Sequence, residues 1–333
     1  MKPTPNINSA WEIADNAALA NCPSPAVSVV ISLYNYAAYI AGCLDSVRAS
    51  KTDGMPGGFE VVVVDDCSKD NSVAVVEKYM AASPLPIRLV KKLTNSGLSD
   101  TRNIGLLLAR APLVFILDAD NTIRPDCLLE HYRALTHSDY ALAFGIINRF
   151  DHDTGASTGT MSHHEWEVSR LVAGPCIDAM AMVRKEAVLS VGGYSVEYGN
   201  MVIAGKRLPQ GWEDYDLWLK LALAGHTGKF IPQILSDYRV HGQSMLQKIL
   251  PAYQGLIAAH FTKKFFRLVA EYNELPTLFG FPRRNLALHC AEGRGMQFSF
   301  QKNPARFIHR VLGKKLSHSL CKRLAELYLW LHP

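Results

Sequence analysis

Residues 59–66 read FEVVVVDD, an apolar run that is interrupted only by Glu60 and followed at once by two aspartates. Similar apolar runs rich in β-branched residues occupy 27–33, 87–90 and 113–117. Runs of this kind lack the alternation of a half-buried strand and are typical of strands covered on both faces, as in parallel sheets. The first 120 residues are therefore predicted to form the start of a parallel sheet.

Segments with helical spacing separate these predicted strands, at residues 36–48, 72–80 and 98–109. Strands that alternate with helices of this length predict βαβ units, and hence an α/β, doubly wound, mostly parallel sheet. Beyond residue 140 the pattern continues less regularly, with predicted strands at 141–147 and 176–183, a turn-rich stretch at 151–160, and helices at 185–190 and 212–224. We expect three regions: a polar lead-in (1–25), the α/β domain (26–250) and a basic helical appendage (251–333).

Composition limits the class of protein. Hydrophobic residues make up 48% and charged residues 20% of the 333 residues, as in ordinary globular proteins. No apolar run approaches the roughly 18 residues that span a bilayer, and the N-terminus lacks the pattern of a secretory signal. The seven cysteines are scattered without CxxC spacing, so reduced thiols and a cytoplasmic location are expected.

The positive charge is concentrated in the last part of the chain. From residue 251 onward there are thirteen Lys/Arg and four Asp/Glu, whereas the preceding part is mildly acidic. This asymmetry argues against a nucleic-acid-binding protein. Two interpretations of the basic region stay open: helices packed on the main domain with solvated basic faces, or a peripheral contact with the anionic inner face of a membrane.

Polar side chains follow each of the four predicted parallel strands. They are Ser32, Tyr34 and Asn35 after the first, Asp65, Asp66, Ser68 and Asp70 after the second, Asn95, Gly97 and Arg102 after the third, and Asp118 and Asp120 after the fourth. Because parallel strands end at the same edge of a sheet, these residues are expected to line one crevice.

The residue types at this edge suit a nucleotide diphosphate. A tyrosine can pack on a nucleobase, a carboxylate can accept a uracil N–H, and the D-x-D pair of Asp118 and Asp120 can hold a divalent ion through oxygen. The chain has no G-x-G-x-x-G after the first strand and no P-loop, which argues against a dinucleotide oxidoreductase and a P-loop NTPase.

Six segments, in order, resemble motifs of glycosyltransferase family 2, which has the GT-A fold. They are VSVVISLYN, VVVVDDCSKDNS, TNSGLSDTRNIGLLLA, FILDADN, GWEDYDLWLKLALAG and YRVHGQS, and they cover about residues 26 to 245. The resemblance implies an inverting hexosyl- or N-acetylhexosaminyltransferase that uses a UDP-sugar and Mg²⁺ or Mn²⁺. It further implies a glycan, glycolipid or protein acceptor, and a role in bacterial-type surface polysaccharide or glycolipid assembly.

The resemblance also assigns roles by position. It implies nucleotide contacts by Ser32, Tyr34, Asp65, Asp66, Asn95, Arg102 and Asp118, metal contacts by Asp120 and His241, and a sugar or acceptor pocket with Asp178, Trp212 and Glu213. Asp214 matches the general base. The chain departs from the family at Ser32, where proline is common, and at Asn121, which replaces a frequent third aspartate.

Asp214 lies at the predicted start of a helix, where the helix dipole favours a charged carboxylate, so we expect it to be ionised at neutral pH. Two other functions remain as alternatives. A sugar-phosphate nucleotidylyltransferase would need a Gly-rich, basic loop after the first strand, and the segment SLYNYAAY lacks one. A catalytically silent nucleotide-sugar- or partner-binding module could lose Asp214 or the D-x-D pair, whereas this chain keeps both.

Overall fold

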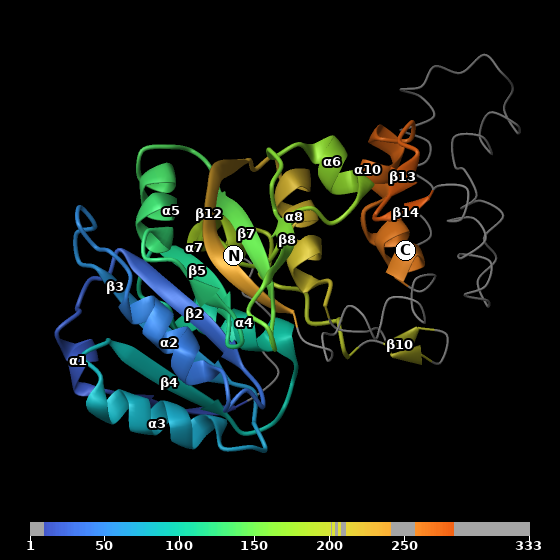
Figure 1. Ribbon diagram of the computed structural model, residues 1–333. Helices are drawn as coiled ribbons and strands as arrows, with labels where there is room; N and C mark the ends of the chain where they lie inside the picture. The colour runs from blue at the N-terminus through green and yellow to red at the C-terminus, as the bar shows by residue number, and fades with distance from the viewer. Residues whose placement is uncertain (1–9, 201, 204–205, 208–210, 241–256, 283–333) are drawn as a thin grey trace, which may run out of the picture. The chain divides into compact units, whose positions relative to one another are not determined.

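Figure 1 shows the computed structural model of the chain, which describes residues 10–200, 202–203, 206–207, 211–240 and 257–282. The central sheet has the strand order β1-β4-β3-β2-β5-β9-β7-β12-β6, and β8 pairs with β7. Its first half contains the parallel strands β4 (Ile87–Lys92), β3 (Phe59–Asp65), β2 (Val27–Leu33) and β5 (Leu113–Asp118). The α/β fold with a mixed, mostly parallel sheet is thus confirmed.

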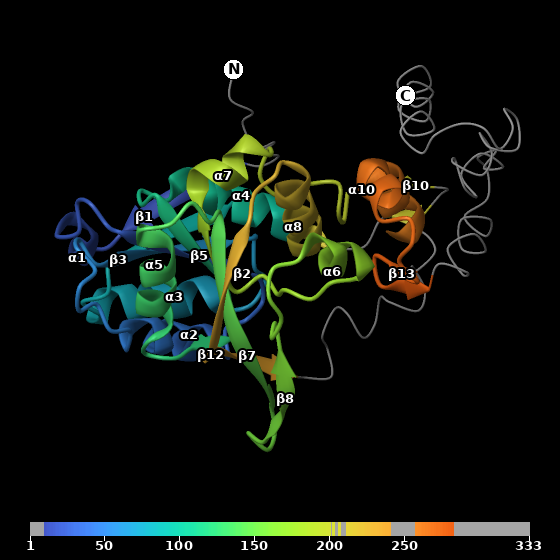
Figure 2. The same ribbon diagram turned by 90° about the horizontal axis from the view of Figure 1, so that it is seen from above.

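Helices cover both faces of this parallel half. Helices α2 (Ile40–Arg48) and α3 (Ser72–Ala82) lie on one face, and α4 (Leu98–Leu108) lies on the other (Figure 2). Every residue of β2 and β3 is buried, which explains the continuous apolar runs in the sequence. Gly105 lets α4 approach β2 closely, because a Cβ there would lie 2.2 Å from Cγ1 of Val30.

The second half of the sheet is mixed, and β6 and β8 are antiparallel to their neighbours β12 and β7. Strand β9 (Ala181–Arg184) is antiparallel to both β5 and β7 (Leu142–Asp151), while β12 (Gly228–Val240) runs parallel to β7. The strand predicted at 176–183 is much shorter than expected. The reason is a polar turn: the backbone N–H of Asp178 donates to Ser162 Oγ, and Asp178 Oδ1 accepts from Met180 N–H.

The N-terminal region differs from the predicted polar lead-in. Residues Trp11–Asp15 form β1, which pairs antiparallel with β4, and Ala17–Ala20 form the short helix α1. The Arg88 guanidinium holds Asp15 at 2.7 and 2.8 Å, and the Asn16 side chain accepts the Leu19 N–H as a helix cap. These non-local contacts with β4 give a polar segment regular structure.

Further short strands and helices are described in the two parts of the chain. They are β6 (Thr122–Ile123), α5 (Cys127–Thr136), β8 (Ser157–Met161), α6 (Val168–Ala173), α7 (Lys185–Ser190), β10 (Val202–Ile203), β11 (Lys206–Arg207), α8 (Glu213–Leu223), α10 (Phe266–Glu271), β13 (Thr277–Leu278) and β14 (Phe281–Pro282). Strand β8 lies in the stretch predicted as turns, because it forms a hairpin with β7.

The described residues divide into two compact units. The larger holds residues 10–171, 175–200, 207 and 211–240, and the smaller holds 172–174, 202–203, 206 and 257–282. The predicted domain boundary at residue 250 and most of the predicted helical appendage lie outside the described residues, so both stay predictions. Within the described part of the chain, no helix is long and apolar enough to cross a membrane.

Candidate active site

The carboxyl ends of three parallel strands lie side by side in the larger unit. The strand register places Ser32 opposite Asp118 and Leu33 opposite Asp65. The polar residues that follow β2, β3 and β5 are therefore brought to one edge of the sheet, as the sequence predicts.

Asp66 is a buried carboxylate that organises the loop after β4. Its Oδ1 and Oδ2 accept the backbone N–H groups of Ser96 and Gly97, both at 3.0 Å. The Nζ of Lys92, a fully buried side chain, lies 2.6 Å from Oδ1 of Asp66. A carboxylate has about four acceptor sites, so Asp66 keeps little capacity for a further donor.

The neighbouring polar groups are less occupied. Burial raises the pKa of Asp65, and its Oδ1, like the Oγ of Ser32, is buried and has no partner among the described residues. Tyr34 is 41% exposed, a surface suited to a stacked ring. Asn95 donates from Nδ2 to the Asp66 carbonyl at 3.1 Å, which gives it a structural contact in this loop.

The D-x-D pair sits in a tight turn at the end of β5, where the Asn121 N–H donates to the Asp118 carbonyl at 3.1 Å. The phenol of Tyr36 hydrogen-bonds with the Asp120 carboxylate. Burial and then the charges of Asp120 and Asp118 raise the pKa of Tyr36, so the phenol keeps its proton at neutral pH.

Arg102 joins the D-x-D pair to the start of α8. Its side chain is only 2% exposed, and it donates from Nη1 to Glu213 Oε1 at 2.8 Å and from Nη2 to Asp118 Oδ1 at 2.9 Å. Its guanidinium also lies 5.4 Å from the ring centroid of Tyr194. Arg102 is therefore a buried bridge between two acidic segments as well as a predicted nucleotide contact.

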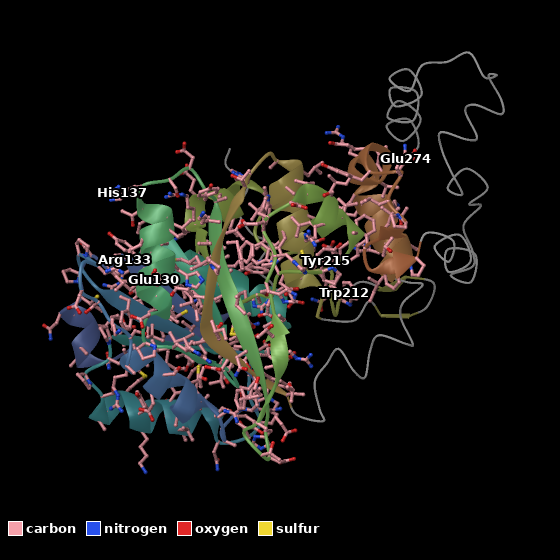
Figure 3. The ribbon with its side chains drawn as sticks, turned by 45° about the horizontal axis from the view of Figure 1, so that its top comes forward. Glu130, Arg133, His137, Trp212, Tyr215 and Glu274 are labelled. Carbon is pink, nitrogen blue, oxygen red and sulfur yellow. The ribbon has the colours of Figure 1, made fainter. Side chains whose placement is uncertain are left out.

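Asp214 lies in the first turn of α8 and accepts the N–H of Tyr215 at 2.7 Å. Trp212, just before the helix, has its ring 6.0 Å from that of Tyr215 (Figure 3). Contrary to the expectation from the helix dipole, burial and then the charges of Glu213 and Asp178 raise the pKa of Asp214 well above its usual range. Desolvation and two neighbouring carboxylates outweigh the dipole here.

Asp178 belongs to the same acidic cluster. Burial and the charges of Asp118 and Asp120 raise its pKa to about 6, and Arg102 opposes this shift. Burial and then the charges of Asp178, Asp118 and Asp120 also raise the pKa of Tyr238 on β12.

The residue pattern alone did not single out Tyr36, Tyr238 or Lys92. The only sequence signal for the two tyrosines is that they lie inside quoted segments, Tyr36 in SLYNYAAY and Tyr238 at the start of YRVHGQS. Lys92 also pairs with Asp100 at 3.0 Å and donates to Thr101 Oγ1 at 3.0 Å, contacts that no local pattern predicts.

The start of α8 rests on a further polar network around the buried Asp216. Its Oδ2 accepts from Ser195 Oγ at 2.6 Å and its Oδ1 from Tyr198 OH at 2.8 Å. Lys220 Nζ donates to the Gly193 carbonyl and to Ser195 Oγ. This network ties α8 to residues 193–198.

The donor set at the D-x-D turn fits a divalent cation that is shared with a bound anion. Asp118 and Asp120 offer hard oxygen atoms to such an ion, and burial and then the charges of these two aspartates raise the pKa of the nearby Asp178. Among the described residues, no three His, Cys, Asp or Glu side chains are grouped so as to hold a metal ion by themselves. His241, the other predicted metal contact, lies outside the described residues.

Comparisons with known proteins agree with this geometry. The model of the family described as "Glycosyl transferase family 2" matches residues 28–191. A similar curated relative is the succinoglycan biosynthesis protein ExoO of Rhizobium meliloti, 38% identical over 128 residues, which are 38% of this chain and 34% of the relative. The chain spans 61% or less of the length of the first curated relatives that it matches.

Solved structures share the fold. Staphylococcus aureus TarS 1-349 in complex with UDP-GlcNAc superposes with a TM-score of 0.55 at 18% identity, covering 86% of this chain and 81% of that one. The mannosyltransferase PcManGT of Pyrobaculum calidifontis, in complex with GDP-Man and Mn²⁺, gives a TM-score of 0.50 at 18% identity, covering 97% and 84%. The predicted GT-A fold is therefore confirmed.

Proposed function

Because residues 28–191 make this chain a member of glycosyltransferase family 2, we propose that it moves a sugar from a UDP-sugar onto an acceptor hydroxyl with inversion. The observation that carries the proposal is the buried Arg102 bridge. One guanidinium joins Asp118 of the D-x-D pair to Glu213, whose neighbour is Asp214. A diphosphate-binding turn and a candidate base are thereby held in a single site.

The nucleotide would occupy the edge formed by β2 and β3. The exposed ring of Tyr34 would pack on the uracil, and the Asp65–Asp66 pair would accept its N–H, with Ser32 lining the pocket. The unpartnered Oδ1 of Asp65 supports a larger part for this residue than the supporting one that the resemblance implies. The affinities of Asp65→Asn and Asp66→Asn for uridine would show which carboxylate accepts the uracil N–H.

Asp120 and Asp118, with His241 beyond the described residues, would hold Mg²⁺ or Mn²⁺ together with the donor diphosphate. When bound, such an ion stabilises the negative charge that develops on the departing nucleoside diphosphate. Tyr36 keeps the Asp120 carboxylate oriented, and Arg102 holds Asp118 against the strand end. PcManGT, which shares the fold, is in complex with Mn²⁺ as well as GDP-Man, and this supports the proposal of a metal.

Asp214 would act as general base. Its carboxylate takes the proton of the acceptor hydroxyl while the acceptor oxygen bonds to the anomeric carbon. The bond from that carbon to the diphosphate breaks, and its electron pair leaves with UDP. A raised pKa makes the ionised carboxylate a stronger proton acceptor, and Asp178, Trp212 and Glu213 would shape the pocket for the sugar and the acceptor.

A role in surface polysaccharide or glycolipid assembly is the proposed biological setting. It draws on the relative named as a succinoglycan biosynthesis protein. UDP-GlcNAc, the nucleotide sugar in the TarS complex, is the first donor to try, as a representative of the hexosyl and N-acetylhexosaminyl class. The basic C-terminal region, for which a membrane contact is predicted, lies mostly outside the described residues, and the test of this contact is co-sedimentation with anionic liposomes at physiological salt.

A panel of nucleotide sugars tests the proposal by thermal shift and calorimetry, first with Mn²⁺ and then with EDTA. We expect one UDP-sugar to stabilise the protein, and both EDTA and Asp120→Ala to remove the effect. Binding of GDP-sugars or nucleoside triphosphates in place of UDP compounds would contradict the uridine assignment. No binding of any nucleotide sugar would favour a silent module instead.

A further inference from the structure

Arg239, near the end of β12, lies directly behind the D-x-D turn. Its Nε donates to the Asp120 carbonyl at 2.9 Å, and its backbone N–H donates to Asn121 Oδ1 at 2.9 Å. We infer that Arg239 is a positioning residue that sets Asp120 for divalent-cation binding and couples this setting to the β7–β8 hairpin. The inference rests on the proposed function and adds a residue that orients Asp120 in the same site.

The backbone of the turn is fixed at three points. The Asn121 N–H bonds to the Asp118 carbonyl, and Arg239 holds the next two groups, the Asp120 carbonyl and the Asn121 side chain. Asn121 is the departure from a frequent third aspartate, and its amide oxygen here accepts the Arg239 N–H. With both ends of the turn bonded, the direction of the Asp120 side chain depends on Arg239.

The guanidinium is itself held between two aromatic rings. Its central carbon lies 5.0 Å from the ring centroid of Tyr39 and 4.7 Å from that of Phe150. A planar guanidinium can stack on two rings while it donates sideways, whereas a lysine ammonium cannot do both. The site therefore requires arginine rather than positive charge alone.

These contacts close a ring around Asp120. The Tyr39 ring lies 5.7 Å from that of Tyr36, and Tyr36 hydrogen-bonds with the Asp120 carboxylate. Arg239 thus holds the backbone of Asp120 while its partner Tyr39 contacts the tyrosine that holds the side chain. A change at Arg239 is expected to reach the carboxylate by both routes.

The β7–β8 hairpin enters the same cluster. Phe150 belongs to β7, and the backbone N–H of His152 donates to the Val240 carbonyl at 3.0 Å. The His152 ring lies 5.4 Å from that of Tyr39, and its Nδ1 is 3.3 Å from Nη1 of Arg239. Any displacement of the hairpin therefore changes the surroundings of the guanidinium that orients the D-x-D turn.

Calorimetric titration of Mn²⁺ into the full chain with saturating UDP tests the inference, using Arg239→Gln and Arg239→Lys. Loss of an outer partner of a metal ligand weakens metal affinity by about 10- to 100-fold, and we expect about tenfold here for both variants. UMP binding in EDTA should be unchanged, and the KM for the donor should rise more than kcat falls. Tyr39→Leu, which keeps the charge, should show a smaller loss in the same direction.

Arg124→Gln is the matched control, because Arg124 pairs with Asp237 on the same strand at 3.1 Å and does not contact the D-x-D turn. Full Mn²⁺ affinity in Arg239→Lys would overturn the requirement for a guanidinium, and full affinity in Arg239→Gln and Tyr39→Leu would overturn the inference. If the wild-type protein binds neither UDP nor Mn²⁺ with UDP, the proposed function itself fails. Thermal unfolding of each variant separates a local effect from loss of the fold.

Discussion

Replacing Arg102 by methionine should destabilise the protein far more than loss of an ordinary ion pair. The guanidinium is 2% exposed and pairs with Glu213, whose side chain is 4% exposed, and with Asp118 at 26%. Removing one partner of a buried pair leaves an uncompensated charge and costs about 3–5 kcal/mol. Glu213 carries most of this cost, because Asp118 can still be reached by water.

The assay is urea and thermal unfolding of the metal-free protein. At about 2–4 °C for each kcal/mol in domains of this size, the melting temperature should drop by about 6–20 °C. Adding Glu213→Gln should restore part of the loss, because it removes the stranded charge. The melting temperature of Arg102→Lys should lie between those of the wild type and Arg102→Met, since an ammonium keeps the charge but cannot donate to both carboxylates with the geometry of a guanidinium.

Arg133→Met provides the control, because Arg133 pairs with Glu130 on α5 in a surface ion pair and is 59% exposed (Figure 3). Such a pair contributes about 0–1 kcal/mol. The reasoning is refuted if Arg102→Met is as mild as Arg133→Met, or if Glu213→Gln makes the double variant worse.

Three further predictions concern packing, pH and catalysis. Gly105→Ala should lower the free energy of unfolding, measured in urea, by about 1–3 kcal/mol, because the added methyl group overpacks against Val30. Gly42→Ala, in α2 with nothing within 4 Å of the added Cβ, should raise it by up to about 1 kcal/mol. Effects of the same sign would contradict the close approach of α4 to β2. Asp178 has a pKa of about 6 in the folded state against 3.8 ordinarily, so its contribution to the stability of the metal-free protein declines as pH rises from about 4 to 6. Asp178→Asn should therefore be more stable than the wild type by up to about 3 kcal/mol at pH 7.5 and equally stable near pH 4. A stability difference that does not change with pH would exclude the raised pKa. Asp214→Asn should lower transfer at least about 100-fold while UDP affinity stays nearly constant, and near-normal turnover would remove Asp214 from the role of base.

The parallel half of the fold follows from local pattern, and the antiparallel additions do not. Buried apolar runs such as residues 61–64 predict their own environment, because a strand covered on both faces is mostly apolar. Strand β1 owes its existence to a partner far along the chain. A polar segment such as Trp11–Asp15 gives no sign that β4 will accept it as an edge strand.

The candidate site shows the same division. Residue types after the strands predict which carboxylates gather, because strand direction places them. They do not predict that Arg102 meets Glu213 across 111 positions of sequence, or that crowding raises the pKa of Asp214. Both depend on how densely charges are packed once the chain has folded. The inferred role of Arg239 could not be predicted from the sequence for the same reason.

The two acidic parts of the proposed donor pocket obtain their positive charge in different ways, and the buried ammonium of Lys92 provides one of them. Beneath Asp66 the chain supplies its own cation, covalently fixed and shielded from water. At the D-x-D turn, by contrast, the proposed function takes its cation from solution. Under metal starvation the protein would then continue to capture uridine and UMP while losing its hold on UDP. Nucleoside monophosphates would become the stronger competitors in that state, so metal supply would govern which nucleotide pool inhibits the protein.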